Sequence, residues 1–554
     1  MQIDRRTLVQ GASAAMAAAV FAPAAARSPA SPDPRAYAKR LATRLAAVDT
    51  AVRNGPYKAD WSSLENYREP GWFRDAKFGI FIHWGVYSVP AFANEWYSRN
   101  MYVRDSDAFK HHVATYGPQT KFGYKDFIPK FAAKRFDANA WVDLFVRAGA
   151  RYVVPVAEHC DGFAMYASQL TGWNVAKMGP KRDFLGELEK AVRARGLRFG
   201  LSSHRAEHWW WYHEGTEFAS DVRDPRYRGI YGPAEPMTLP ADRETIRGEP
   251  DPSHLERWLP PSQAFLDDWL GRSAELAAVY RPEFIYFDWW INQTAFEPYL
   301  RRFAAAYYNM AAAQGQGPVL TYKMEAFPPG AAVLDIERGK LDALRLRPWQ
   351  SDTSVSIKSW GYVEHDSYRT ATSLLSDLVD VVSKNGNLLL NVGPKSDGTI
   401  PEEASAVLLQ IGDWLKTNGE AIYGTRPWIL YGEGATNTGT GEKKEIVERV
   451  YSPADIRFTT KGSALYAIGL AYAPNNAVVI KTLYRDTPYL AGQIRAVRLL
   501  GTPKPVEWRQ ARAGLSVQLP ERVALPYVLR IETAWSAAQS ALSARGHPAG
   551  MAKR

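Results

Sequence analysis

Short apolar runs alternate with longer segments of helical periodicity between residues 72 and 414. Continuous apolar strands separated by amphipathic helices indicate a parallel sheet covered by helices. No Gly-rich nucleotide loop follows the first strand, so the pattern favours an α/β fold of the (β/α)₈ TIM-barrel type over an open sheet, spanning residues 61–425. The expected strands are Phe78–Ile82, Tyr152–Val156, Arg198–Leu201 and Phe284–Phe287, and the expected helices are Trp141–Ala148, Phe184–Arg195 and Ser262–Tyr280.

The pattern changes near Arg426, where short alternating segments recur at regular spacing between turn residues. This is typical of an antiparallel β-sandwich, which we expect over residues 426–535. A disordered tail is expected over residues 536–554. The expected strands are Ile446–Tyr451, Ala464–Leu470, Ala477–Leu483, Ile494–Leu500 and Leu515–Leu519.

The first 26 residues have the features of an export signal. Arg5 and Arg6 precede a weakly apolar, Ala-rich stretch that ends in three small residues, Ala24–Ala26. This pattern predicts a twin-arginine signal peptide and a periplasmic or secreted protein. The stretch is too short and too weakly apolar to span a bilayer, so no membrane anchor is expected. Residues 27–60 are expected to form a linker and a short helix.

Composition narrows the possible partners. The chain has 554 residues, enough for two or three domains, with a net charge of +10. Its Lys and Arg residues are scattered without a run of like charges, which argues against nucleic-acid binding. The single Cys160 excludes an internal disulfide. The 13% aromatic content suits a sugar-binding site, and equally a large core. Nothing in the sequence indicates the oligomeric state.

Polar residues follow the predicted strands, at the positions where barrel loops open onto one common face. A lone His at such a position is more often structural than functional. Together, however, His, Glu, Trp and Asp at successive strand ends predict a polar pocket with aromatic walls, which suits a sugar ring and its hydroxyls. The segments are His83-Trp84-Gly85, Asn94-Glu95-Trp96-Tyr97, Glu158–Phe163, Ser202–Trp209, Asp288-Trp289-Trp290, and Ser383–Pro394 followed by Asp397-Gly398.

These motifs resemble the α-L-fucosidase family of retaining glycoside hydrolases (glycoside hydrolase family 29), from about Trp72 to Trp428. The Asn-Leu-Leu-Leu-Asn-Val-Gly-Pro segment is the most specific of them. The resemblance implies a catalytic barrel followed by a β-sandwich. It also implies exo-acting, retaining hydrolysis of terminal α-L-fucosyl or related L-galactosyl residues of glycans, with neither a cofactor nor a metal ion.

The resemblance assigns roles to individual residues. In the family an Asp ends the fourth strand and forms the covalent intermediate; Tyr280–Asp288 matches that segment, so Asp288 is the predicted nucleophile. Two positions depart from the family pattern: Trp289 replaces a Gly, and Cys160 replaces a second His. Because a thiol is a poor hydrogen-bond partner, His204 is a plausible substitute. The predicted sugar-binding residues are His83, Glu95, Trp96, His159, His204, Trp289 and Trp360.

The sequence offers three candidates for the acid/base residue. A retaining enzyme needs a second carboxyl about 5 Å from the nucleophile. Many relatives place a Glu where Gln350 stands in this chain, and an amide cannot exchange the proton. Glu337, expected in a loop between strands, is the favoured candidate. Glu325, expected at a strand end, is an alternative acid/base or a sugar contact, and Asp352 is a third candidate.

Two other functions fit parts of the sequence. His204–His208 matches His-x-x-Glu-His, an inverted zinc-peptidase motif, but that chemistry needs both histidines on one helical face, and here they directly follow a strand. A non-catalytic sugar-binding protein on the same scaffold is the other alternative, because the usual acid/base is missing.

Overall fold

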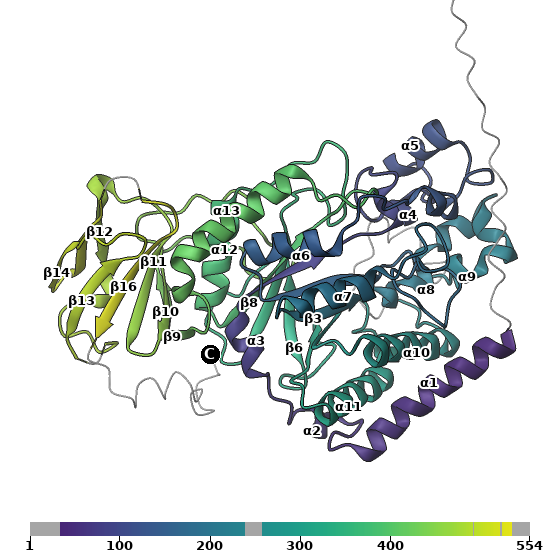
Figure 1. The fold of residues 1–554 in the computed structure, drawn as a ribbon, viewed down its shortest axis with the longest axis horizontal. Helices are drawn as coiled ribbons and strands as arrows, with labels where there is room; N and C mark the ends of the chain where they lie inside the picture. The colour runs from purple at the N-terminus through teal and green to yellow at the C-terminus, as the bar shows by residue number, and fades with distance from the viewer. Residues whose placement is uncertain (1–33, 239–257, 491, 521–522, 534–554) are drawn as a thin grey trace, which may run out of the picture.

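The computed structural model describes residues 34–238, 258–490, 492–520 and 523–533. The predicted signal peptide over 1–26 and the predicted tail over 536–554 lie outside the described residues. Figure 1 shows a large barrel region and, at the far left, a smaller region of sheets. No helix among the described residues combines the length and the apolar character needed to cross a bilayer.

Eight parallel strands form a closed barrel in which each strand pairs with its neighbour in sequence and the last pairs with the first. Their side chains are almost all buried, because the strands face the barrel interior on one side and the helices on the other. The predicted (β/α)₈ fold is therefore confirmed. The strands are β1 Phe78–Ile82, β2 Tyr152–Glu158, β3 Arg198–Ser203, β4 Phe284–Phe287, β5 Val319–Tyr322, β6 Val333–Glu337, β7 Trp349–Ser354 and β8 Gly386–Val392.

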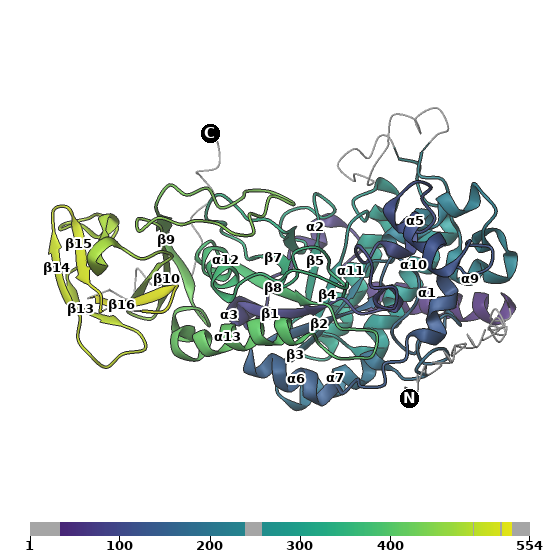
Figure 2. The ribbon, with the colours of Figure 1, turned by 90° about the horizontal axis from the view of Figure 1, so that it is seen from above.

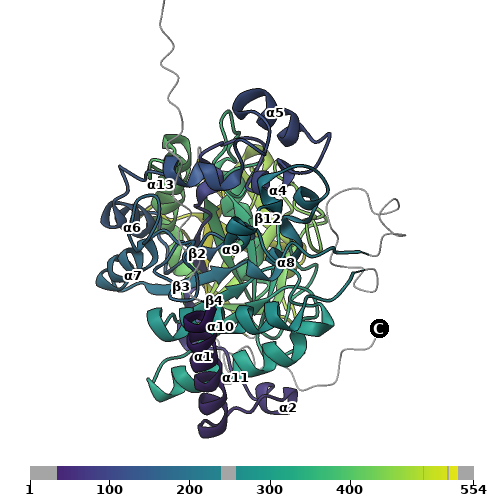
Figure 3. The same cartoon turned by 90° about the vertical axis from the view of Figure 1, so that its right-hand side faces the viewer.

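Helices surround this barrel (Figure 3). Several begin at a side-chain cap: Ser262 accepts a hydrogen bond from the Phe265 N–H at the start of α10, and Thr370 accepts one from the Ser373 N–H at the start of α12. The main covering helices are α6 Ala138–Arg147, α7 Phe184–Ala194, α10 Gln263–Tyr280, α11 Glu297–Ala313, α12 Ala371–Ser383 and α13 Glu402–Asn418. Shorter helices precede or interrupt them: α2 Trp61–Leu64, α3 Gly71–Ala76, α4 Tyr97–Asn100, α5 Asp107–Tyr116, α8 His208–Trp211 and α9 Arg228–Tyr231.

The short helix expected near the N-terminus is longer than predicted. Helix α1, Pro34–Asn54, has 21 residues and packs against α10 and α11 on the outside of the barrel (Figures 1 and 3). Tyr37 donates a hydrogen bond to Asp268 of α10 at 2.7 Å, and Arg302 of α11 binds Asp49 at 2.9 Å. These contacts attach α1 to the barrel, so this segment is more than a linker.

Two antiparallel sheets share a hydrophobic core at one end of the molecule, beyond α12 and α13 (Figure 2). This confirms the predicted antiparallel C-terminal region. The larger sheet has the order β13-β16-β11-β10-β9, and the smaller has the order β12-β15-β14. Their bounds are β9 Arg426–Glu433, β10 Ile456–Lys461, β11 Ala464–Gly469, β12 Ala477–Ile480, β13 Ile494–Leu499, β14 Glu507–Ala511, β15 Gly514–Gln518 and β16 Tyr527–Thr533.

One predicted strand is wrong. Ile446–Tyr451 belongs to an irregular connection between β9 and β10, and its backbone pairs with neither sheet. The strand at this place in the sheet is β10, which begins at Ile456. The predicted segment contains three apolar residues, Ile446, Val447 and Val450, and Val450 is 88% exposed. Val447 of this segment lies against the barrel instead: its carbonyl accepts a hydrogen bond from Ser373, and its side chain lines the candidate site.

Candidate active site

A cavity of about 300 Å³ opens where the barrel strands end. It brings together most of the residues predicted from the sequence. Glu325 is not among its lining residues, because this side chain lines a separate cavity beside Tyr322 and Phe327. The predicted residues that do line the site are His83, Glu95, Trp96, His159, His204, Asp288, Trp289, Glu337, Asp352 and Trp360.

Asp288 directly follows β4, so a rigid strand sets the position of its carboxylate. The Nδ1–H of His204 donates a hydrogen bond to Oδ2 of Asp288 at 2.5 Å, and the backbone N–H of Asp288 donates to the Ser203 carbonyl. Burial raises the pKa of Asp288, but the charge and hydrogen bond of His204, together with Lys323, outweigh burial and hold that pKa well below its usual range. The carboxylate is therefore ionised and available as a nucleophile.

We expect His204→Phe to weaken catalysis through Asp288. Without the hydrogen bond and the electrostatic attraction of His204, the pKa of Asp288 rises towards its ordinary value. Because a nucleophile must be ionised, the acid limb of the pH profile of kcat/KM moves to higher pH. At neutral pH we expect kcat/KM to fall about tenfold to a hundredfold, as for a lost hydrogen bond to a charged group.

The matched control for this variant is His112→Phe. His112 is also buried, but it bonds to the Phe122 carbonyl and to Tyr97, outside the pocket. This variant should keep the wild-type acid limb. An unchanged limb in His204→Phe would show that His204 does not hold Asp288 in its ionised form.

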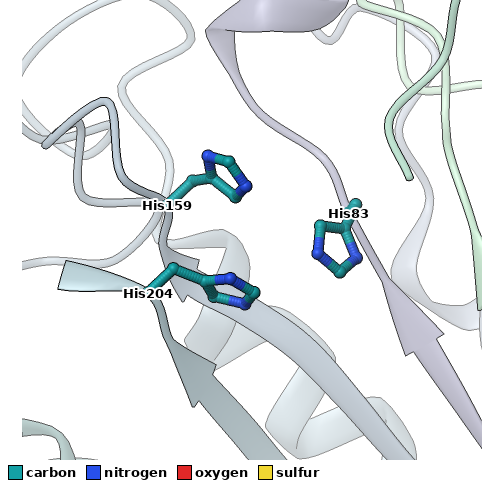
Figure 4. Close-up of side chains that lie close together, drawn as sticks. All are labelled: His83, His159 and His204. Atoms are coloured by element: carbon teal, nitrogen blue, oxygen red, sulfur yellow. The ribbon is translucent and has the colours of Figure 1, made fainter. Parts of the chain in front are cut away.

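Three histidines from three strand ends face one another in the pocket (Figure 4). Burial is the main cause that lowers the pKa values of His83 and His159 well below the usual range, so both rings are neutral. His83 Nδ1–H donates to Asn391 at 2.8 Å, which leaves its other nitrogen as an acceptor. His159 Nδ1 has no hydrogen-bond partner among the described residues. Neutral imidazoles of this kind suit the hydroxyl groups of a sugar.

The same three histidines also meet a distance condition for metal binding, because their ligand atoms lie within 4.8 Å of one another. Both ring nitrogens of His204 are already engaged, however: Nδ1 with Asp288 and Nε2 with Ser202 at 3.0 Å. A metal ion would have to displace one of these contacts. The arrangement therefore fits a sugar better than a metal ion.

The zinc-peptidase motif is not assembled as a metal site. His204 reaches the pocket, whereas Nδ1–H of His208 donates to the Cys160 carbonyl at 2.9 Å. The two residues lie on different elements, because a 3₁₀ turn, Arg205–Glu207, separates β3 from α8.

Glu95 and two tryptophans form a further part of the pocket wall. Glu95 is buried and accepts hydrogen bonds from Ser359 at 2.8 Å and from the Trp360 N–H at 2.9 Å. Burial raises the pKa of this carboxyl. The Trp360 ring lies 5.2 Å from the His83 ring, and Trp96 packs on Trp211. These side chains supply the aromatic wall that the sequence predicts.

Glu337 is the last residue of β6, not a loop residue as expected, because the strand continues in register with Asp352 of β7. Its Oε2 accepts a short hydrogen bond from the Trp289 indole, and Lys323 lies 3.7 Å away. The side chain is 10% exposed and borders the cavity, so it can reach a bound substrate.

Asp352 also lines the cavity, but its side chain is only 1% exposed. It is paired with Lys323 at 3.1 Å and accepts a hydrogen bond from Tyr286 at 2.8 Å. These buried contacts suit a structural ion pair. Among the three carboxyl candidates, the geometry therefore favours Glu337 as the acid/base.

The sequence did not indicate that the connection between β9 and β10 enters the site. Lys443 N–H donates to the Glu337 carbonyl at 2.8 Å, and Glu445 N–H donates to the Arg338 carbonyl at 2.7 Å. The Glu337 N–H in turn donates to the Glu442 carboxylate at 2.6 Å. The loop thus docks on the end of β6. The four consecutive charged residues Glu442–Glu445 were the available sequence signal that this segment is a loop, because such a run is unfavourable inside a strand.

We expect Glu445→Ala to release this loop. The Glu445 carboxylate binds the buried Arg369 at 2.5 Å and accepts a hydrogen bond from Thr353 at 2.7 Å. Removing one partner of a buried ion pair should lower the free energy of unfolding by about 3 kcal/mol. KM should rise as well, because Lys443 and Val447 line the pocket.

Urea unfolding and steady-state kinetics measure the two effects of Glu445→Ala. Lys444→Ala is the matched control, since its side chain is exposed in the same loop. A loss of stability with no change in KM would contradict a role of the loop in substrate binding.

Comparisons with known proteins agree with this geometry. Residues 44–420 match the family model for α-L-fucosidase, and residues 451–536 match the model for the α-L-fucosidase C-terminal domain. Residues 421–450, which contain the docked loop, lie outside both matches. The tissue α-L-fucosidase of Rattus norvegicus is 30% identical over 87% of this chain and 92% of its own length. The human plasma α-L-fucosidase is 31% identical over 83% of this chain and 88% of its own length.

Solved structures of α-fucosidases also resemble this chain. A crystal structure of Thermotoga maritima α-fucosidase is 32% identical and superposes with a TM-score of 0.67, covering 86% of this chain and 100% of that one. The same protein has been solved in complex with fucose. With a family match over more than half of its length and relatives at 30% identity or more over most of it, the chain belongs to the α-L-fucosidase family of glycoside hydrolases.

Proposed function

We propose that this protein is an exo-acting, retaining α-L-fucosidase that removes terminal α-L-fucosyl residues from glycans. One observation carries the proposal: an ionised carboxylate, Asp288, and a second carboxyl, Glu337, border the same aromatic-walled pocket. Two carboxyl groups in these roles are what retaining glycoside hydrolysis needs. The pocket volume of about 300 Å³ suits one terminal sugar unit better than an internal segment.

In the first step an oxygen of Asp288 attacks the anomeric carbon, and the bond from that carbon to the leaving oxygen breaks. Glu337 gives its proton to the departing oxygen, so the aglycone leaves as a neutral alcohol and Glu337 becomes a carboxylate. The sugar is then bound covalently to Asp288.

In the second step Glu337 takes a proton from water while the water oxygen attacks the same carbon. The bond to Asp288 breaks, the Asp288 carboxylate is regenerated and Glu337 recovers its proton. Two inversions give overall retention, so α-L-fucose is the first product released.

The neutral imidazoles of His83 and His159, together with Glu95, are suited to hold the sugar hydroxyls. Trp96 and Trp360 are suited to cover the apolar face of the ring. His204 has a different role in this proposal, because its Nδ1 holds Asp288 rather than facing the sugar.

Hydrolysis of 4-nitrophenyl α-L-fucopyranoside, followed by proton NMR, tests the proposal. We expect release of nitrophenol and first appearance of the α anomer. A parallel assay with the α-L-galactopyranoside measures how well a hydroxymethyl group is accepted in place of the methyl group. Binding of L-fucose without release from any aryl fucoside would instead support a non-catalytic sugar-binding protein, and initial formation of the β anomer would overturn the double displacement.

We also propose export by the twin-arginine route to the periplasm or the exterior. The support is the sequence of residues 1–26, with Arg5 and Arg6 before a weakly apolar stretch. Cell fractionation and N-terminal sequencing test it. The mature chain should begin after the Ala24–Ala26 segment, and Arg5→Lys with Arg6→Lys should leave a full-length chain in the cytoplasm. Export of that double variant would contradict the proposed route.

A further inference from the structure

Glu207 is a carboxyl in the pocket wall that none of the roles above uses. It ends the 3₁₀ turn after β3 and is only 2% exposed, yet it borders the same cavity as Asp288. Its Oε2 has no hydrogen-bond partner among the described residues. Leaving a buried polar atom unpaired costs about 1–3 kcal/mol, so an unpaired oxygen beside a binding pocket points to a partner supplied by the ligand.

The surroundings of Glu207 favour its uncharged form. Burial, and then the nearby charge of Asp288, raise its pKa well above the usual range. The cation of Lys443 and the neighbouring Cys160 thiol act in the opposite direction and are outweighed. A neutral carboxyl offers one O–H donor and acceptor oxygens, which suits a sugar hydroxyl. It cannot replace Asp288 as the nucleophile, since attack requires an anion.

A hydrogen bond joins the two segments of the wall that carries Glu207. His208, the next residue, donates from Nδ1 to the carbonyl of Cys160 at 2.9 Å, and burial lowers the pKa of His208 to about 3, so this ring stays neutral. This bond ties the residue after Glu207 to the backbone of Cys160, and both Glu207 and Cys160 border the cavity. Side chains positioned by such contacts select a ligand by geometry.

Cys160 by itself is a weak hydrogen-bond partner for a sugar. His204 does not fill this gap, because its two nitrogens contact Asp288 and Ser202. Glu207 is a neighbour of the Cys160 thiol, and its Oε2 has no hydrogen-bond partner among the described residues.

We propose that Glu207 is a further sugar-contacting residue that determines specificity: its carboxyl binds one ring hydroxyl of the terminal sugar at the wall formed with Cys160. This inference rests on the proposed function, because the ligand is the fucosyl unit held in front of Asp288.

Two nearly isosteric variants test the contact. Glu207→Gln keeps an uncharged donor and acceptor, whereas Glu207→Met removes both and keeps the length. Each is assayed with 4-nitrophenyl α-L-fucopyranoside and with its 2-, 3- and 4-deoxy analogues. We expect Glu207→Met to lower kcat/KM about tenfold to a hundredfold on the parent fucoside, and Glu207→Gln to lower it less than about fivefold.

The deoxy analogues separate a sugar contact from a structural role. On the analogue that lacks the contacted hydroxyl, the wild type and Glu207→Met should have nearly equal kcat/KM values, so that their ratio falls to near 1. Glu275→Gln is the control: Glu275 is buried in α10 and accepts hydrogen bonds from Ser168 and Gln169, away from the pocket. Any loss in this control should be equal on all four substrates. An equal loss on all four substrates in Glu207→Met would overturn the proposal.

A second measurement needs neither the Met variant nor turnover. Infrared difference spectra of the wild-type protein with and without L-fucose should show a shifted carboxylic-acid band that is absent in Glu207→Gln. The absence of such a band in the wild type, with fucose bound, would also overturn the proposal. Because only binding is needed, this result stays distinct from a failure of the proposed hydrolysis.

Discussion

Asp288→Gly is expected to hydrolyse aryl α-L-fucosides at least about 10⁴-fold more slowly than the wild type, because no other group replaces a missing covalent nucleophile. The carboxylate follows a buried strand, is held by His204 and is ionised. Stopped assays over long incubation times measure the residual rate. Asp267→Ala is the control, since Asp267 lies on α10 and accepts a hydrogen bond from Tyr299, outside the pocket.

Azide should restore turnover in Asp288→Gly. The small anion can occupy the space left by the side chain and attack the anomeric carbon, which gives a fucosyl azide of inverted, β configuration. Labelling of the wild type with a 2-fluoro fucosyl fluoride provides an independent check, because the trapped sugar should be found on the peptide containing Asp288. A label on any other side chain would show that the nucleophile is a different residue.

Glu337→Ala is expected to lose about 10²- to 10⁴-fold in rate on natural fucosylated glycans, the usual contribution of a general acid. The loss should be much smaller for glycosylation with a nitrophenyl leaving group, which departs without a proton. The steepness of the dependence of kcat/KM on the leaving-group pKa measures this difference. Added azide should accelerate the second step and give a fucosyl azide of retained configuration, because it attacks the covalent intermediate.

The other carboxyl candidates provide the controls for Glu337→Ala. Glu325→Ala should leave the leaving-group dependence unchanged, since Glu325 lines a separate cavity. Asp352→Asn should destabilise the fold, because it removes one partner of the buried ion pair with Lys323. It should not steepen the dependence of kcat/KM on the leaving-group pKa. If either variant reproduced the behaviour expected of Glu337→Ala, the acid/base would have to be reassigned.

Much of the barrel and the location of Asp288 could be predicted from local sequence patterns. An apolar run such as Phe284–Phe287, ended by a charged residue, predicts a buried strand with a polar group at its end. Because strand ends converge in a closed parallel barrel, His83, His159 and Asp288 were expected to meet, and they do. These inferences depend on neighbours in sequence and on a topology that repeats, and both can be inferred from the chain itself.

Other features depend on contacts between distant residues. The segment Ile446–Tyr451 has the short apolar pattern of a strand, but the preceding residues, Glu442–Glu445, dock on the end of β6, about a hundred residues earlier in the chain. Local pattern carries no information about such a partner. For the same reason the sequence favoured Glu337 only on an expected loop position and kept Glu325 and Asp352 as alternatives, whereas the structure separates the three carboxyls by their surroundings.

The sequence by itself therefore determined the barrel, the antiparallel C-terminal region and the strand end that carries Asp288, because each follows from periodicity and from motifs of adjacent residues. Only the tertiary structure decided which candidate carboxyls border the same pocket as Asp288, which loop docks on the end of β6, and that Glu207 is buried in the wall of that pocket. The physical reason is that hydrogen bonding, burial and charge at a site are set by side chains that folding brings together from distant parts of the chain.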